Sequence, residues 1–421
     1  MSKNSFSILE YKAFYTLSDC AEPYYDAEKN LILPSKTFEA IESFYYANAD
    51  VQQYFAPAKK HGKKAFRAQN YVGVIQTKDG TTIEILPKIQ NIDEEESKKI
   101  LIKMLKTLKK SPFKNFNTAN LKSSKLPLLE IFISMFLEEL AKLVQKGIKS
   151  DYVTKEENLK FLKGKLKIGE QIKHNTIHKE RFFVEYQEFM SDRVENRLIK
   201  TTLQYVYKKS KSNRNQQRIR EFLFVFDEIK PSHDIKTDFS KVRLNRQMKD
   251  YEQVLLWCKT FLLENSFSPY KGDDVAFALL FDMNLLFESY VGDYLKKKGL
   301  DVSLQDKGKH LVEEPKKFAL KPDIVIKHEN EVIVADTKWK IIKEEKDISQ
   351  SDMYQLFAYG KKYKNQQLYL IYPVNSEKEL ELFYEYENGL NLHVLFFDVK
   401  KDFKDCHFLK SIQTRDKSNS L

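Results

Sequence analysis

The sequence predicts an α+β protein of several domains: a small mixed β domain over residues 1–115, a helical middle region over 116–264 and an α/β domain over 265–421. Three observations predict this architecture. The chain has 421 residues, which is too long for one compact core. Its hydrophobic fraction of 42% is large enough to build real cores. The spacing of apolar residues also changes along the chain, from β-rich runs to helical spacing and then to alternating helix and strand.

Charge and cysteine content narrow the class of partner and the compartment. Lys and Arg outnumber Asp and Glu by 71 to 60, which favours a polyanionic partner, nucleic acid or an anionic membrane surface, although many lysine-rich proteins bind neither. Cys20, Cys258 and Cys406 form no CxxC pair, so a zinc ribbon and a disulfide framework are excluded. The N-terminus has no apolar core of signal-peptide length, and Glu130 interrupts the apolar stretch at 126–137. We therefore expect a soluble, cytoplasmic protein without membrane association.

In the N-terminal domain the clearest element is a β-hairpin from Tyr71 to Lys88. Two β-rich runs flank the pair Asp79-Gly80, which tolerates the positive φ of a tight turn. The preceding segment, Lys59–Arg67, is expected to be a basic loop that either contacts phosphates or is simply solvated. Charged sequence from Asp93 to Ser124 predicts a helix followed by a linker.

The middle region is predicted to be mostly helical. Apolar residues recur at helical spacing over 132–144, and Gly147 is placed to end that helix. Asp192, with Glu195 three residues later, predicts a capped helix that runs to Lys208.

The C-terminal domain alternates helix and strand. An apolar helix is expected at Val275–Lys298 and a second helix at Ser351–Lys364. The predicted strands are Ala319–Lys327, Val332–Asp336, Leu368–Tyr372 and Leu392–Val399.

Two carboxylates and a lysine gather at the ends of two of these strands. Asp323 follows Pro322 at the start of one apolar strand, and the next strand ends at Asp336 with Lys338 two residues on. Residues two apart in a strand point to the same face, so Asp336 and Lys338 project together. Pairing of the two strands in a hairpin brings Asp323 beside them.

This combination of side chains suits metal-assisted phosphodiester hydrolysis. Mg²⁺ binds one or two carboxylates and completes its shell with waters and phosphate oxygens, and Mn²⁺ can substitute for it. The bound ion polarises the phosphate and acidifies a water, while a nearby lysine neutralises developing charge. The alternative is a surface ion pair at the strand ends. Asp336 follows four apolar residues, where a plainly solvated charge is less expected.

Further polar residues stand where such a site would use them. Gln355 and Tyr359 are four residues apart on the following helix and share a face with Asp352. We consider Gln355 and Tyr359 candidate catalytic residues, with an ordinary amphipathic helix as the alternative. Glu288 lies in a mostly apolar helix, where it is either a third metal-directed carboxylate or a solvent-facing residue.

Other chemistries are not supported by the sequence. Gly164 and Gly169 have P-loop spacing, but Glu170 and Gln171 follow where Lys and Ser or Thr are required. The chain contains neither HExxH nor GxSxG.

The order of the site residues is similar to that of a known superfamily. The pattern PD, then DTK, then QxxxY resembles the PD-(D/E)xK nucleases. More narrowly, the chain resembles the McrC family, the nuclease subunits of McrBC-type restriction systems, over most of residues 65–370. Three stretches carry this resemblance: YVGVIQTKDGTTIEILPKI, then FLKGKLKIGEQI with YQEFMSDRVENRLIK, and finally FDMNLLFESYV, KPDIVI, VIVADTKWK and DMYQLFAY.

The resemblance implies a fold, a site and a partner. The C-terminal domain would have the PD-(D/E)xK nuclease fold, with Asp323, Asp336 and Lys338 as its catalytic acids and lysine and Glu288 as an acidic position on its first helix. The N-terminal domain would dock to a ring-forming, McrB-like AAA+ GTPase and stimulate its hydrolysis. Recognition of the DNA site, often a methylated cytosine, would belong to that partner, and some relatives pair with partners that read unmethylated sites.

The leading hypothesis is therefore a Mg²⁺-dependent endonuclease subunit that cuts double-stranded DNA when driven by a GTPase partner. The alternative is a non-catalytic, DNA-binding scaffold that activates the partner. A free-standing repair or recombination nuclease is a third reading, but bare cleavage has no need of the N-terminal and middle regions.

Overall fold

The computed structural model of the protein describes residues 5–17, 20–47, 53–109, 111–114, 126–264, 275–328, 331–364, 367–374 and 382–401. Cys406 and most of the linker expected before Ser124 lie outside these residues. The chain divides into two compact units, Met1–Leu128 with Tyr270–Leu421, and Leu129–Pro269. The division into three domains stays a prediction.

The described helices fall into two groups. Those of the first unit are α1 (Ser35–Ala47), α2 (Glu94–Leu105), α9 (Met283–Lys297) and α10 (Gln350–Tyr363). Those of the second unit are α3 (Leu128–Gln145), α4 (Ile168–Asn175), α5 (Val194–Lys209), α6 (Asn213–Val225), α7 (Ile235–Lys241) and α8 (Tyr251–Lys259). The first residue of α3, Leu128, is the last residue of the first segment of the first unit. Within the described ranges, no helix has both the length and the apolar character needed to cross a membrane.

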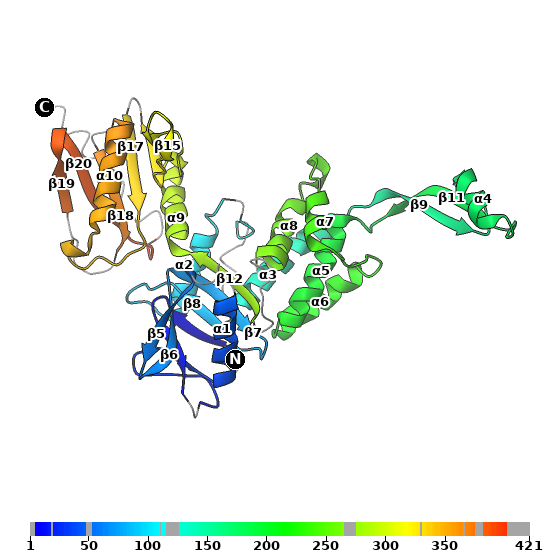
Figure 1. Ribbon diagram of the computed structural model, residues 1–421, viewed down its shortest axis with the longest axis horizontal. Helices are drawn as coiled ribbons and strands as arrows, with labels where there is room; N and C mark the ends of the chain where they lie inside the picture. Colours follow the sequence, from blue (N-terminus) through cyan, green and yellow to red (C-terminus); the bar gives the residue numbers. More distant parts are fainter. Residues whose placement is uncertain are drawn as a thin grey trace. The chain divides into compact units, whose positions relative to one another are not determined.

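Two sheets form the N-terminal part of the first unit (Figure 1). One, in the order β3-β4-β2-β6-β5, contains β2 (Ala13–Thr16), β3 (Tyr24–Tyr25), β4 (Leu31–Leu33), β5 (Phe55–Lys60) and β6 (Lys63–Ala68). The other, in the order β1-β8-β7-β12, contains β1 (Ser5–Leu9), β7 (Tyr71–Thr77), β8 (Thr82–Leu86) and β12 (Val275–Asp282). The predicted hairpin is confirmed as β7 and β8, and Gly80 at its turn has a φ of 85°.

The basic segment Lys59–Arg67 is part of a second hairpin, and the prediction of a loop was wrong. Lys60 of β5 pairs with Lys63 of β6, and His61 and Gly62 form the turn with φ angles of 48° and 73°. Lysine-rich sequence is depleted in strands, and a His-Gly turn is a weaker hairpin signal than Asn-Gly. The tip of this hairpin is exposed.

The helix predicted over Val275–Lys298 was wrong in its first eight residues, which form β12. β12 pairs antiparallel with β7, and Leu280 lies opposite Gly73. A continuous apolar run fits a buried strand and a buried helix equally well by periodicity, so only the pairing decides. Ala278 and Leu280 join the apolar core of the N-terminal sheets and α1. A strand from distant sequence therefore completes the N-terminal fold.

The second unit is mostly helical, as predicted, but it also contains a sheet that the sequence did not predict. In the order β10-β11-β9, its strands are β9 (Asp151–Leu159), β10 (Lys165–Leu166) and β11 (Phe182–Met190). Charged residues crowd β9, and apolar residues lie on both faces of β11, so neither strand shows the alternation that marks a half-buried strand. The pair β9–β11, with α4, extends away from helices α5–α8 of the same unit (Figure 1).

The predicted end of α3 was confirmed, whereas the predicted N-terminal cap of α5 was not. Helix α3 follows the predicted spacing, and Gly147, with a φ of 87°, lies just beyond its end. The predicted cap of α5 was wrong, because Arg193 occupies the N-cap position without a side-chain hydrogen bond. Asp192 instead accepts hydrogen bonds from Arg197 Nε at 2.8 Å and Nη2 at 2.7 Å.

The C-terminal part of the first unit is built on a six-stranded mixed sheet (Figure 1). In the order β13-β16-β17-β18-β20-β19, its strands are β13 (Asp301–Leu304), β16 (Ile324–His328), β17 (Glu331–Thr337), β18 (Gln367–Pro373), β20 (Leu390–Phe397) and β19 (Leu382–Tyr386). A separate hairpin is formed by β14 (His310–Val312) and β15 (Lys317–Ala319). The last three predicted strands are confirmed as β17, β18 and β20. The first was wrong in extent, because Ala319 ends β15 and β16 starts only after Pro322.

Helices α9 and α10 cover opposite faces of this sheet. Neighbouring residues of a strand point to opposite faces of the sheet. Phe396 of β20 packs in the core under α10. Phe397 packs edge-on against Tyr294 of α9, with ring centroids 5.2 Å apart. Val334 of β17 also lies in the core under α10. Asp336, two residues on, therefore projects from β17 toward the face that α10 covers.

We predict that Gly73→Ala strongly destabilises the first unit, because the pairing of β7 with β12 leaves no room for a side chain. An added Cβ would lie 2.0 Å from Leu279 O, and Gly73 has a φ of 144°. The free energy of unfolding should fall by at least about 3 kcal/mol in chemical denaturation. Gly62→Ala is the matched control, since its φ is 73° but nothing lies within 4 Å. It should lose only ~1 kcal/mol, and equal losses would contradict the tight pairing.

Candidate metal and phosphodiester site

The structure brings Asp323 and Asp336 to adjoining ends of two paired strands. Ile324 at the start of β16 lies opposite Ala335 of β17, so the residue before one and the residue after the other are neighbours across the pair. Thr337 donates from its backbone N–H and its hydroxyl to Asp323 Oδ2, each at 2.8 Å. These hydrogen bonds hold the Asp323 carboxylate against the end of β17.

Asp336 carries a buried carboxylate with unmet bonding capacity. The residue is 1% exposed, and neither carboxylate oxygen has a hydrogen bond of regular geometry to any part of the chain that the structure describes. The Lys338 ammonium forms an ion pair with Oδ2 at 2.6 Å. Burial, together with the charge of Asp323, raises the pKa of Asp336 to about 7 against the opposing effect of Lys338. A surface ion pair, the alternative left open by the sequence, does not describe this residue.

Lys338 connects Asp336 to helix α10. Its Nζ donates to Gln355 Oε1 at 3.2 Å and lies 3.9 Å from Asp352 Oδ1. Gln355 Nε2 in turn donates to the Tyr359 hydroxyl at 2.6 Å. Burial opposes the charged form of Lys338, but attraction to Asp336 outweighs it and raises the pKa. The lysine is therefore held as an ammonium, and the three polar residues of α10 surround it from one helix face.

Glu288 reaches the same region from α9. It is 5% exposed, and Gln305 Nε2 donates to its Oε2 at 2.9 Å, so it does not face solvent. Burial raises the pKa of Glu288 to about 7, and the negative charges of Asp323 and Asp336 contribute to the shift. The three carboxylates thus lie within electrostatic reach of one another, with two helices and two strands supplying them and their partners.

The donor set fits a hard divalent cation. Burial also raises the pKa of Asp323, so three acids at one edge of the sheet resist ionisation until positive charge approaches. Among the residues that the structure describes, no three His, Cys, Asp or Glu side chains are close enough to enclose a metal by themselves. Mg²⁺ needs only one or two carboxylates, since waters and substrate oxygens complete its shell. The orphaned oxygens of Asp336 are suitable ligands for Mg²⁺ or Mn²⁺.

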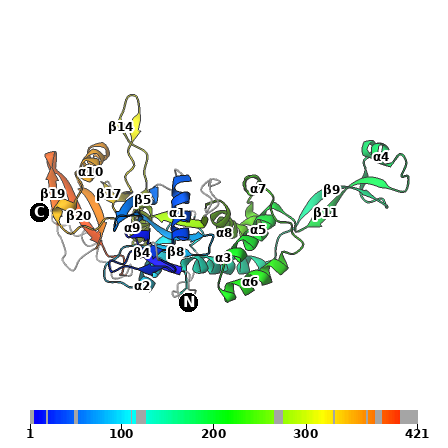
Figure 2. The ribbon, with the colours of Figure 1, turned by 60° about the horizontal axis from the view of Figure 1, so that its bottom comes forward.

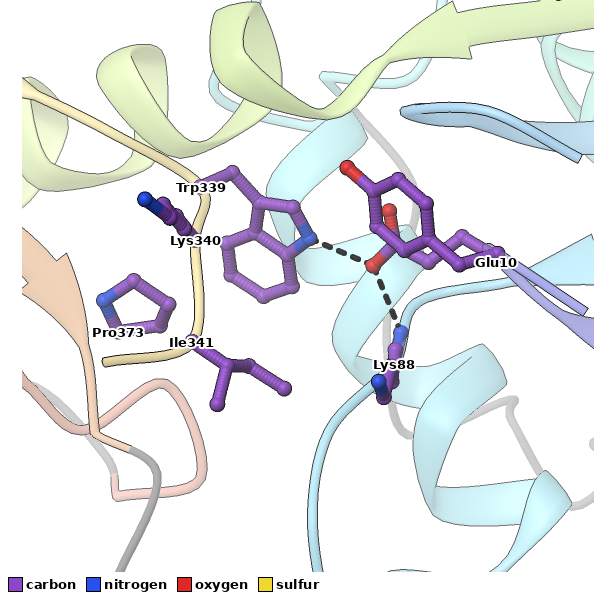
Figure 3. A pocket seen from close by; sticks show the side chains of 7 residues that line it. Glu10, Lys88, Trp339, Lys340, Ile341 and Pro373 are labelled. Carbon is purple, nitrogen blue, oxygen red and sulfur yellow. Dashed lines mark hydrogen bonds between the residues drawn. The ribbon is translucent and has the colours of Figure 1, made fainter. Parts of the chain in front are cut away.

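Sequence reasoning missed the contacts that position the segment after Lys338. The indole Nε1–H of Trp339 donates to Glu10 Oε1 at 2.6 Å, and Lys88 N donates to the same oxygen at 2.8 Å (Figure 3). The Trp339 backbone N–H donates to Asn284 Oδ1 at 3.1 Å. The sequence offers only two local signals for Trp339: it is one of two tryptophans in the chain, and it directly follows Lys338. Glu10 lies 329 residues away, and no local pattern indicates that it pairs with Trp339.

A small pocket of about 150 Å³ lies beside this contact (Figure 3). Glu10, Tyr11 and Lys88 line it from the N-terminal part, and Trp339 to Ile341 with Pro373 line it from the C-terminal part. Glu10 Oε2 is buried without a hydrogen-bond partner in the described chain. Burial raises the pKa of Glu10 to about 7, although the bonds from Trp339 and Lys88 oppose this shift. The carboxyl group is thus poised to lose its proton near neutrality.

We predict that Glu10 makes the stability of the protein depend on pH. A carboxyl group with a raised pKa stabilises the folded state fully below its unfolded value, ~4.5, and this contribution is lost as pH rises through about 7. Relative to Glu10→Gln, the wild-type free energy of unfolding should therefore fall by up to about 3 kcal/mol between pH 4.5 and 8. Denaturant titrations of both proteins across this range measure the difference. Parallel stability profiles would contradict the assignment.

Comparison with known proteins identifies the family. A family model described as "McrBC 5-methylcytosine restriction system component" matches residues 66–373. No curated protein matches the chain. The fold is similar to that of a chain in the "Refined half-complex from tetradecameric assembly of Thermococcus gammatolerans McrB AAA+ hexamers with bound McrC", with a TM-score of 0.69, 19% identity and 99% of each chain covered.

A second solved structure, the "Cryo-EM structure of the Thermococcus gammatolerans McrBC complex", contains a similar chain with a TM-score of 0.51 and 22% identity, over 73% of this chain and 90% of that one. At these identities the likeness shows a shared fold. The family model covers more than half of the sequence. The chain therefore belongs to the family of McrBC 5-methylcytosine restriction system components.

Proposed function

We propose that this chain is the endonuclease subunit of an McrBC-type restriction complex and hydrolyses phosphodiester bonds of double-stranded DNA with Mg²⁺. The observation that carries the proposal is the buried carboxylate of Asp336, whose contact in the described chain is the ion pair with Lys338 at 2.6 Å and which lies beside Asp323. The mixed sheet with α9 and α10 on its two faces supports the PD-(D/E)xK fold that the sequence pattern implies. Cytoplasmic location is part of the same proposal.

Each residue of the site has a distinct role in the proposed reaction. Asp336 and Asp323 would hold the ion, with Glu288 as a third carboxylate directed at it. When bound, Mg²⁺ supplies Lewis-acid polarisation of the phosphate and lowers the pKa of a nearby water. The Lys338 ammonium neutralises negative charge that develops on the phosphate oxygens. Gln355 accepts a hydrogen bond from Lys338 Nζ at 3.2 Å and donates one to the Tyr359 hydroxyl at 2.6 Å, so it fixes the direction of the lysine side chain.

The alternative is a DNA-binding scaffold that activates its partner without cutting. A binding module gains nothing from two buried carboxylates and a half-buried third one next to a polyanion, because their charges repel phosphates. Such a cluster of carboxylates can contribute to DNA binding only when a cation bridges the carboxylates and the phosphate. The burial and the raised pKa values of Asp336 and Glu288 therefore favour the enzyme.

We predict that Asp336→Asn lowers DNA cleavage on the order of 10³-fold or more, because the ion loses a ligand while the neutral side chain remains buried. Fold and partner binding should stay close to wild type in thermal melts and pull-down assays. Asp301→Asn, an exposed acid on β13 of the same sheet, is the matched control and should cut normally. Lys338→Ala should also be inactive but should bind Mg²⁺ better than Asp336→Asn in calorimetry.

The same assay tests the metal. EDTA should abolish cleavage, Mg²⁺ or Mn²⁺ should restore it, and Ca²⁺ should support DNA binding without cutting. Cleavage by Asp336→Asn at the wild-type rate, or full activity in excess EDTA, would remove the basis of the proposal.

The proposed partner is a ring-forming AAA+ GTPase like the McrB of the solved assemblies. Docking through residues 1–115 is a proposal that rests on the resemblance, but the hairpin Tyr71–Lys88 offers little surface, since β8 is fully buried and β7 nearly so. The tip of the β5–β6 hairpin, with Lys63 and Lys64, is one exposed part of that region.

A second candidate docking surface is the extension formed by β9, β11 and α4. Large apolar side chains are exposed along it, and such side chains on a monomer mark protein interfaces. They are Tyr152, Phe161, Leu162, Ile168, Ile172, Ile177 and Phe189.

We predict that Ile168→Ser with Ile172→Ser reduces stimulation of GTP hydrolysis by the partner on the order of tenfold, because exposed apolar anchors dominate interface energetics. Lys63→Glu with Lys64→Glu tests the N-terminal assignment in the same phosphate-release assay. Loss of stimulation in the lysine variant alone would place the docking surface on residues 1–115. Asp336→Asn should stimulate normally, and the chain alone should hydrolyse no GTP.

A further inference from the structure

The hairpin β14–β15 extends from the edge of the proposed active site and has no role in the six-stranded sheet (Figure 2). We propose that it binds the sugar-phosphate backbone and groove of duplex DNA beside the point of cleavage. This inference rests on the proposed nuclease function and adds a substrate-binding element to it. Its attachment, its charge and its exposed apolar side chains each support the assignment.

The hairpin is joined at both ends to the catalytic strands. The chain enters it after Gln305, whose N–H donates to Asp323 O at 2.9 Å, and leaves it through Lys321, two residues before Asp323. Leu320 N donates to Lys309 O at 2.9 Å and closes the base of the hairpin. Whatever the hairpin binds is therefore held next to Asp323.

Helix α10 anchors the hairpin from the side. Tyr363 donates from its hydroxyl to Asp306 Oδ2 at 2.7 Å, and Lys362 pairs with Glu313 at 3.0 Å. The ion pair with Lys362 also neutralises Glu313 of the hairpin, so the remaining net charge of the hairpin is more positive. Since α10 carries the side chains around Lys338, the hairpin and the site share one rigid support.

The hairpin and its base carry a row of lysines that take no part in the close ion pairs of the described chain. Five are exposed, and no carboxylate in the described chain lies within ion-pairing distance of any of them. They are Lys307, Lys309, Lys316, Lys317 and Lys321. Unpaired, solvated ammonium groups are the side chains that release counterions from a phosphate backbone. A protein partner would require acids opposite them, whereas the proposed substrate is itself a polyanion.

Exposed apolar side chains accompany these charges. Leu311, Val312 and Phe318 are all exposed, and Phe318 is 71% exposed with a φ of 56°, an unusual backbone conformation for a bulky residue. A two-stranded sheet of this size gains no core from them, because it joins no other sheet. A β-ribbon fits the major groove of DNA, where apolar side chains contact thymine methyl groups.

Binding of the full-length chain to a short duplex, measured by fluorescence anisotropy in EDTA over a range of salt concentrations, tests the inference. Lys316→Ala with Lys317→Ala should weaken binding on the order of tenfold and lower the slope of log K against log salt by about 2. Lys236→Ala with Lys241→Ala removes two exposed lysines of α7 and is the matched control; it should leave both quantities unchanged.

A variant of the exposed apolar residue Phe318 of β15 separates the two kinds of contact. Phe318→Ala should weaken binding without changing the salt slope, because an apolar contact releases no counterions. Both sets of variants should keep the wild-type thermal melt, since the hairpin lies outside the cores.

The outcomes distinguish this inference from the proposed function. If the wild-type complex cuts DNA and the hairpin variants bind and cut as well as wild type, the inference is overturned and the nuclease assignment stands. If the hairpin variants lose stimulation of the partner GTPase while DNA binding is unchanged, the hairpin is a protein interface and the inference is also overturned. If Asp336→Asn cuts normally, the proposed function fails, whatever the hairpin does.

Discussion

The pairing of β12 with β7 is the constraint on which the geometry of the first unit depends. It brings residue 282 to the N-terminal sheet, where Asn70 O accepts from Met283 N at 3.0 Å and Asn70 Nδ2 donates to Asp282 Oδ1 at 3.2 Å. Helix α9 starts at that point and is therefore aimed by the N-terminal sheet. One turn of the helix later stands Glu288, and Asn284 holds the backbone of the residue after Lys338.

This arrangement connects the N-terminal part of the unit to the proposed catalytic site in two ways. One runs through β12 and α9, and the other is the direct bond from Trp339 to Glu10. A segment with two independent supports loses less conformational entropy when substrate binds, because it is already ordered. The proposed partner-docking region and the proposed nuclease residues thus belong to one compact unit, which is a physical basis for coupling between them.

Charge is segregated across the C-terminal sheet. Asp323, Asp336 and Glu288 are held inside, where burial raises their pKa values, while the lysines of the β14–β15 hairpin are exposed. Buried acids favour a cation, since its charge restores the ionised form that burial disfavours. Exposed lysines favour a phosphate backbone at the rim. A site with acids inside and bases outside therefore suits a polyanion that meets a divalent ion.

The chemistry of the site followed from local sequence, whereas its architecture did not. Asp336 and Lys338 lie two apart at the end of an apolar run, and strand alternation alone placed them on one face. Helical spacing alone placed Gln355 and Tyr359 together. By contrast, the apolar run at 275–282 looked helical because periodicity cannot separate a buried strand from a buried helix. Strand β9 was missed because charged residues crowd it, and β11 was missed because apolar residues lie on both of its faces.

By itself, then, the sequence determined the local order of the proposed catalytic side chains, most of the strands of the C-terminal sheet and the hairpin β7–β8, because each depends on residues close together in the chain. Only the tertiary structure decided that residues 275–282 complete the N-terminal sheet and that Glu10 holds Trp339. It also decided that Glu288 turns inward. These features join residues that are distant in sequence, and their free energy comes from packing and from buried hydrogen bonds that no local pattern records.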